Sequence, residues 1–129
     1  MDEVNVAVIA PILGRDLSFV SDVDPRVRVF DANFAGPGLL ADILAQAEVL
    51  LVGYPVPEVL AARAPRLAWA HHTQAGVSNL AGTDLWRSDV TLTSSRGAVA
   101  ATAIAEYALA AAAHVARGVS YSAPHQAGS

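Results

Sequence analysis

The sequence predicts an α/β domain built on a doubly wound parallel sheet of about five strands, followed by one long alanine-rich helix. Short β-branched and apolar runs recur along the chain, and segments of helical or turn composition separate them. Strands that alternate with helices are typical of a parallel sheet. The chain has 129 residues, 53% of them hydrophobic and 16% charged, which suits one compact domain with a buried core.

The first half of the chain predicts three strands and two helices. Residues 4–10 form a β-branched run that a proline closes, and we expect a buried strand there. A short helix is expected over 16–22 and a second strand over 27–30. A helix over 37–47 opens on a proline, a residue that suits the first helical position. Residues 48–53 are apolar without alternation, as in a strand covered by helices on both faces.

The second half predicts two more strands and the long helix. We expect one or two helical turns over 57–63, a fourth strand over 67–71 and a fifth over 90–93. The alanine-rich segment 98–117 predicts the long helix, and Gly118 is a plausible C-cap.

Five βα units in this length predict a flavodoxin-like arrangement, in which ligands bind beyond the carboxyl ends of the strands. We therefore expect the functional loops to follow the strands. Residues 1–117 would form the domain with its connecting helix 98–117, and residues 118–129 a linker or a truncated end.

Composition excludes several classes of protein. The formal net charge is −4, and no basic patch is present, so we expect no nucleic-acid partner. The chain has no cysteine, which removes disulfides and thiolate chemistry and favours the cytoplasm. Its start is acidic, unlike a secretory signal. The most apolar segment is mostly alanine and carries Glu106 and His114, so we expect a soluble helix and no membrane contact.

The segment 73–78 follows the fourth predicted strand and offers a possible anion site. A turn of small residues exposes successive backbone N–H groups, and such a concavity binds anions. Gly76 has no Cβ, so a carboxylate could approach closely. The alternative is an ordinary turn between a strand and a short helix.

Ser94, Ser95, Arg96 and Gly97 precede the long helix. A serine hydroxyl could cap that helix, and Arg96 could bind a carboxylate. The simpler interpretation, which we prefer, is a capped helix start with a solvated arginine.

Other polar residues have a structural explanation. His71 and His72 are adjacent in a strand, so their side chains point to opposite faces and do not readily share a metal ion. We expect one to pack and the other to reach the cleft. Glu106 could be a general base if buried, but an ion pair or hydrogen bond at a domain junction is the preferred interpretation.

Three familiar motifs are missing. The segment Gly36-Pro37-Gly38 lacks the pattern of a dinucleotide-binding loop. No Gly-x-Ser-x-Gly elbow of a serine hydrolase occurs. A phosphorylated receiver domain would need acidic residues where the sequence has Pro11-Ile12 and Gly53-Tyr54.

Three segments in order resemble one known family. Residues 47–52 (A-E-V-L-L-V) are similar to its third strand, and 64–69 (A-P-R-L-A-W) with 75–77 (A-G-V) to its "a-P-x-L-k-w-i … A-G-v-d" pattern. Residues 90–97 (V-T-L-T-S-S-R-G) and 104–110 (I-A-E-Y-A-L-A) are similar to "v-x-l-t-n-s-x-G … v-A-E-h-v-l-a". This is the N-terminal part of the D-isomer-specific 2-hydroxyacid dehydrogenases.

The resemblance implies a two-domain enzyme, in which a Rossmann domain that binds NAD or NADP follows the connecting helix. It implies that backbone N–H groups of Ala75, Gly76 and Val77 bind the substrate carboxylate. It also implies that Ile104 approaches the nicotinamide and that Glu106 is structural. No catalytic residue and no metal ligand is assigned within this chain.

Two features depart from the family pattern. The strand end reads His-His-Thr-Gln over 71–74, and Ser78 stands where the family usually has Asp. The family's Gly-rich cofactor motif, carboxylate-binding arginine and catalytic histidine come after the matched part and have no place here.

The expected function is therefore the substrate-side domain of an NAD(P)-dependent oxidoreductase that acts on 2-hydroxy or 2-keto acids, similar to glyoxylate and hydroxypyruvate reductases. We expect it to be inactive alone. Its partners would be the small acid, the Rossmann domain of the parent chain and a second copy in a homodimer. The alternative is a stand-alone, non-catalytic binding or dimerisation module with the same fold.

Overall fold

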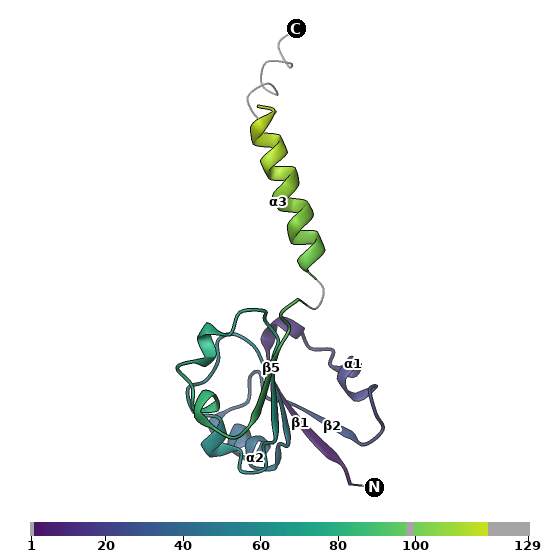
Figure 1. Ribbon diagram of the computed structural model, residues 1–129. Coiled ribbons are helices and arrows are strands. Elements are labelled where there is room, and N and C mark those ends of the chain that lie inside the picture. Colours follow the sequence, from purple (N-terminus) through teal and green to yellow (C-terminus); the bar gives the residue numbers. More distant parts are fainter. Residues whose placement is uncertain (1, 98–99, 119–129) are drawn as a thin grey trace. The chain divides into compact units, whose positions relative to one another are not determined.

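The computed structural model describes residues 2–97 and 100–118. The chain divides into two compact units, Met1–Arg96 and Gly97–Ser129. The first unit holds a sheet with short helices, and the second holds one long helix (Figure 1). The helices and 3-10 turns of the described residues, in chain order, are η1 (Pro11–Leu13), α1 (Ser18–Ser21), α2 (Pro37–Gln46), η2 (Ala61–Arg63), η3 (Ser78–Leu80), η4 (Asp84–Arg87) and α3 (Ala101–Ala116).

The first unit contains a five-stranded sheet in which every strand pairs in parallel with its neighbour, in the order β2-β1-β3-β4-β5. The strands are β1 (Val4–Ile9), β2 (Val27–Asp31), β3 (Val49–Val52), β4 (Trp69–His72) and β5 (Thr91–Ser94). This order is that of a flavodoxin-like doubly wound sheet, so the predicted fold class is confirmed. Each predicted strand is found within one or two residues of its expected limits.

One face of the sheet packs against α2. Leu50 and Val52 of β3 are fully buried, and they share a core with Ile43 and Leu44 of that helix. The loop between β3 and β4 covers the same face through Leu60, which is also fully buried. A leucine removed from water completely stabilises the fold by roughly 1.5–3 kcal/mol, so this face supplies much of the stability.

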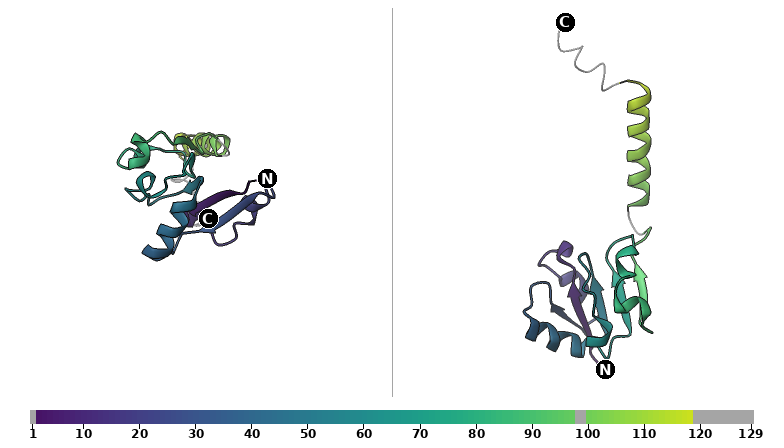
Figure 2. Two further views of the ribbon diagram at one scale, coloured as in Figure 1. Left: turned by 90° about the horizontal axis from the view of Figure 1, so that it is seen from below. Right: turned by 90° about the vertical axis from the view of Figure 1, so that its left-hand side faces the viewer.

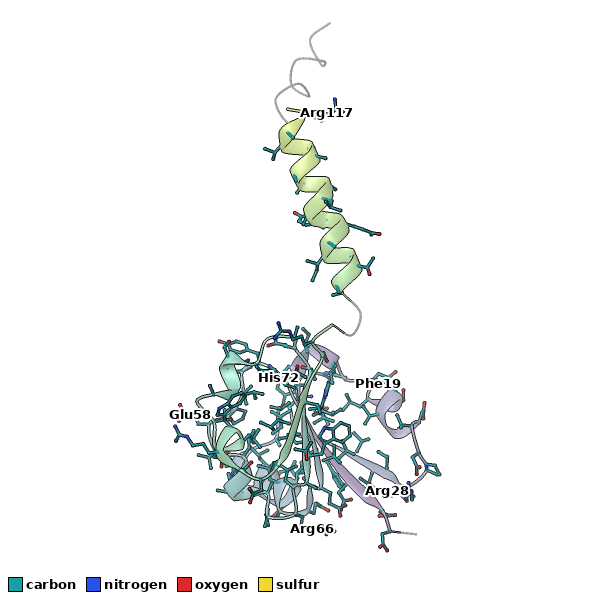
Figure 3. The ribbon with its side chains drawn as sticks, in the orientation of Figure 1. Phe19, Arg28, Glu58, Arg66, His72 and Arg117 are labelled. Carbon is teal, nitrogen blue, oxygen red and sulfur yellow. The ribbon has the colours of Figure 1, made fainter. Side chains whose placement is uncertain are left out.

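The other face carries a second core under α1, where Val6 and Val8 of β1 pack with Leu17. Figure 3 places Phe19 of α1 and Glu58 of the β3–β4 loop on opposite sides of the sheet. Because α1 has only four residues, this face is covered incompletely. An apolar groove of about 310 Å³ remains beside α1, and Trp69 at its border is 42% exposed.

The start of α2 follows the sequence prediction. Pro37 is the first residue of the helix and Gly36 precedes it in extended conformation. The helix (blue in Figure 2) ends at Gln46, one residue earlier than expected, and Ala47 and Glu48 connect it to β3.

The expected helical turns over 57–63 are largely absent. Only η2 forms, and residues 57–60 are not helical. The carboxylate of Asp84 accepts hydrogen bonds from the N–H groups of Leu60, Ala61 and Ala62, at 2.8, 3.0 and 2.9 Å. These N–H groups would be the free donors at the start of a helix. A distant aspartate satisfies them instead, which fixes the segment as a loop with one tight turn.

The second unit consists of α3, which begins at Ala101 rather than at residue 98. Residues 98–99 lie outside the described residues, as do 119–129 of the expected linker. The residue before the helix is Ala100, and no side chain caps the helix start, so the expected serine cap is wrong. Gly118 follows the last helical turn with φ 62°, and its N–H donates to the Val115 carbonyl at 3.1 Å, as expected of a glycine that ends a helix.

Candidate functional site

The turn that follows β4 contains backbone N–H groups that donate no hydrogen bond to any described residue. At its base, the Thr73 N–H donates to the Val52 carbonyl at 2.9 Å. Within it, the N–H groups of Ala75, Gly76 and Val77 donate no hydrogen bond in the part of the chain that the structure describes. Ala75 and Gly76 are exposed and Val77 is half-buried, so the turn lies at the surface of the first unit.

Two glycines differ in the space around them. A Cβ at Gly76 would meet no atom within 4 Å, so the space in front of the turn is open. A Cβ at Gly53, which ends β3, would lie 3.0 Å from Thr73 Oγ1 and 3.1 Å from the Ala10 Cβ. The close packing at Gly53 holds the base of the turn, while the open space at Gly76 leaves room for a ligand.

The segment after β5 lies beside this turn. The Ser95 N–H donates to the carbonyls of His72 at 3.1 Å and of Gln74 at 3.3 Å. The structure therefore brings together the two segments that the sequence singled out, 73–78 and 94–97, at the carboxyl ends of β4 and β5.

A chain of side-chain hydrogen bonds runs along the same pair of strands. The Trp69 indole N–H donates to Thr93 Oγ1 at 2.8 Å. The same oxygen lies 2.8 Å from His71 Nδ1, and His71 Nε2 lies 3.1 Å from Ser95 Oγ. Sequence reasoning missed this network, because it depends on the β4–β5 register, in which His71 pairs with Thr93.

The two adjacent histidines point to opposite faces. His72 is 1% exposed, and its Nδ1 lies 3.0 Å from the Val52 carbonyl, which can only accept. His72 is therefore the histidine that packs in the core (Figure 3). Its Nε2 is buried and has no hydrogen-bond partner among the described residues. Among the described residues, no group of three or more metal-ligating side chains is placed to hold a metal ion.

Three other residues singled out in the sequence are solvent-exposed. Arg96 is exposed, and its guanidinium makes no ion pair or hydrogen bond within the described residues. Ile104 on α3 is 65% exposed. Glu106 on the same helix is exposed and makes no ion pair with any described residue, so its expected structural contact stays a prediction.

Comparison with protein-family models and with curated proteins finds no match to this chain. None of the helices that the structure describes is long and apolar enough to cross a membrane.

Proposed function

We propose that this chain is the substrate-side domain of an NAD(P)-dependent oxidoreductase that acts on 2-hydroxy and 2-keto acids. The observation that carries the proposal is the row of unpaired N–H groups at Ala75, Gly76 and Val77. They would bind the substrate carboxylate.

The position of the turn supports this assignment. Ligands of open parallel sheets bind beyond the carboxyl ends of the strands, and this turn follows the carboxyl end of β4. Successive backbone N–H groups bind anions because each contributes a fixed partial positive charge. Hydrogen bonds to a carboxylate are roughly twice as strong as those between neutral groups, so a few such donors can orient a small acid.

The chain itself offers little to a dinucleotide. It has no Gly-rich phosphate loop, so the proposal assigns most of the cofactor contacts to another domain. Ile104, whose side chain is exposed, would contact the nicotinamide. When bound, NADH or NADPH would supply the hydride. The turn at residues 75–77 would bind and orient the acid.

A titration with oxamate, a stable mimic of a 2-keto acid, tests the carboxylate site. In amide-resolved NMR spectra of the chain, we expect the signals of Ala75, Gly76 and Val77 to shift most. The variant Gly76→Ala should bind more weakly, because its Cβ enters the open space in front of the turn.

The matched control is Gly82→Ala. Gly82 is also exposed, has no positive φ and has open space around an added Cβ, but it lies outside the turn. We expect Gly82→Ala to bind oxamate like the natural chain. Shifts spread evenly over the surface, or equal affinities for the two variants, would contradict the proposal.

A dimerisation module is the second candidate, and the exposed apolar side of α3 favours it. Ile104, Ala108, Ala111 and Val115 recur at intervals of four, three and four residues, the spacing of a coiled-coil seam. Ile104 is 65% and Val115 75% exposed. In an antiparallel pair of copies, Ile104 would face Val115 of the second copy and the two alanines would face each other.

Light scattering over a range of concentrations tests this candidate. The variant Ala108→Glu places a charge in the seam and should yield a monomer. The variant Ala113→Glu places the same charge on the opposite side of the helix and should leave a dimer intact. A natural chain that is monomeric at all concentrations would exclude the candidate.

A further inference from the structure

We propose that the Ser95 hydroxyl is a specificity-determining donor that binds the oxygen on the carbon next to the substrate carboxylate. The inference rests on the proposed function, because it takes the carboxylate to lie on the turn 75–77. It adds a residue that directly follows the neighbouring strand β5, and a reason why the site would prefer 2-keto acids to plain carboxylic acids.

The first member of the hydrogen-bond chain favours one direction for the whole chain. An indole N–H can only donate, so Thr93 Oγ1 accepts from Trp69. The Thr93 hydroxyl hydrogen is then free to be donated to His71 Nδ1, 2.8 Å away. Hydrogen bonds that point the same way along a chain polarise and strengthen one another, which favours this arrangement.

The same direction continues to the end of the chain. A neutral imidazole that accepts at Nδ1 carries its hydrogen on Nε2. In this arrangement His71 donates from Nε2 to Ser95 Oγ, 3.1 Å away. The Ser95 hydroxyl hydrogen has no acceptor among the described residues, and it is the free end of the chain.

The surroundings of Ser95 add donors to the site. Its backbone N–H contacts the Gln74 carbonyl, so Ser95 directly adjoins the turn with the unpaired N–H groups. The next residue, Arg96, is exposed and forms no ion pair with any described residue. A ligand at this edge meets hydrogen-bond donors from the segments that follow β4 and β5, which favours a molecule with several acceptor oxygens close together.

A second oxygen beside the carboxylate distinguishes 2-keto acids from plain acids. Oxamate has that oxygen and propionate lacks it, while both have a carboxylate for the turn. One hydrogen bond changes affinity by roughly three- to tenfold, so Ser95→Ala should weaken oxamate binding by that factor. Propionate binding should not change, because propionate has nothing for the hydroxyl to bind.

The experiment measures both acids by amide-resolved NMR titration of the full chain. Ser94→Ala is the matched control, because Ser94 is half-buried and its hydroxyl makes no hydrogen bond with any described residue. Ser95→Thr should restore oxamate affinity, since it keeps the hydroxyl. A loss confined to oxamate and to Ser95→Ala supports the proposal.

The other outcomes separate this inference from the proposed function. If both acids shift the signals of 75–77 but Ser95→Ala behaves like Ser94→Ala, the role of Ser95 is wrong and the carboxylate site remains. If neither acid shifts those signals, both proposals are wrong.

The tautomer of His71 gives a readout that needs no ligand. Long-range ¹⁵N–¹H correlation spectra distinguish a hydrogen on Nε2 from one on Nδ1. We expect the hydrogen on Nε2, and Thr93→Val should remove the preference by deleting the donor to Nδ1. A neutral His71 with its hydrogen on Nδ1 in the natural chain would overturn the inferred direction.

Discussion

Asp84 holds the loop between β3 and β4 in place, and its replacement by asparagine should destabilise the first unit. The carboxylate accepts from three consecutive N–H groups, at 2.8, 3.0 and 2.9 Å. Asparagine keeps one oxygen, so two of these bonds could survive as neutral bonds. The third would be lost, because an amide nitrogen does not accept.

The size of the effect follows from the charge and the number of bonds. A hydrogen bond to a charged group contributes roughly 1.5–3 kcal/mol, against about 0.5–1.5 kcal/mol for a neutral one. Because Asp84 is partly solvent-accessible, we take the lower part of that range. Asp84→Asn should then lower the free energy of unfolding by about 2–3 kcal/mol. In a domain of this size each kcal/mol lowers Tm by roughly 4–8 °C.

The pKa of Asp84 determines how this effect depends on pH. Desolvation raises the pKa of this carboxyl, but the hydrogen bonds from Ala62, Leu60 and Ala61 outweigh it, so the pKa lies below its usual value. A lowered pKa in the folded state stabilises the protein above the pKa of the unfolded chain, about 3.9. This stabilisation is lost as the pH falls through the lower, folded-state value.

Thermal unfolding followed by circular dichroism at neutral and at acidic pH measures both effects. Asp89→Asn is the matched control, because Asp89 is exposed and its side chain makes no hydrogen bond with any described residue. We expect the difference between the natural chain and Asp84→Asn to be full at pH 7 and to shrink as the pH falls below about 4. Equal Tm values for the Asp84 and Asp89 variants would refute the reasoning.

Three further results are expected. Gly53→Ala should lower stability by about 1–3 kcal/mol in urea unfolding, because its Cβ would lie 3.0 Å from Thr73 Oγ1, whereas Gly82→Ala should not change it. Leu50→Ala should lower the free energy of unfolding by about 2–5 kcal/mol in the same assay, since Leu50 is fully buried. Leu39→Ala, at a position 58% exposed, should lower it by less than about 0.5 kcal/mol. A spectrophotometric assay of the chain with NADH and glyoxylate should show no turnover, because the chain lacks a dinucleotide-binding loop; measurable turnover would contradict this.

The strands were accessible from the sequence because the signal for each one is local. Residues of β3 form an uninterrupted apolar run whose alternate members contact two different cores. Leu50 and Val52 are buried in one, and Val49 and Leu51 pack, partly buried, against the other. A short run with apolar residues on both faces is typical of a strand in a sheet interior, so the pattern indicates position as well as conformation.

The features that the sequence did not predict depend on contacts between distant residues. The N–H groups that an expected helix over 57–63 would leave free are bound by Asp84, 22 to 24 residues further along the chain. The link from His71 to Ser95 spans 24 residues and requires the register of β4 against β5. Neither pairing leaves a periodic signal in the sequence, since a single polar residue gives the same local pattern whether or not a distant partner binds it.

The proposed ligand belongs at the turn after β4 and not in the apolar groove beside α1. The groove has a volume of about 310 Å³ but an apolar lining. A carboxylate in the groove would lose its hydration among side chains such as Val6, Phe19 and Leu51. Burying a charge without replacement hydrogen bonds is strongly unfavourable. The one indole donor at the border, Trp69 Nε1, already donates to Thr93. The turn, by contrast, has N–H groups that donate to no described residue, so an anion gains hydrogen bonds at the turn that the groove does not offer.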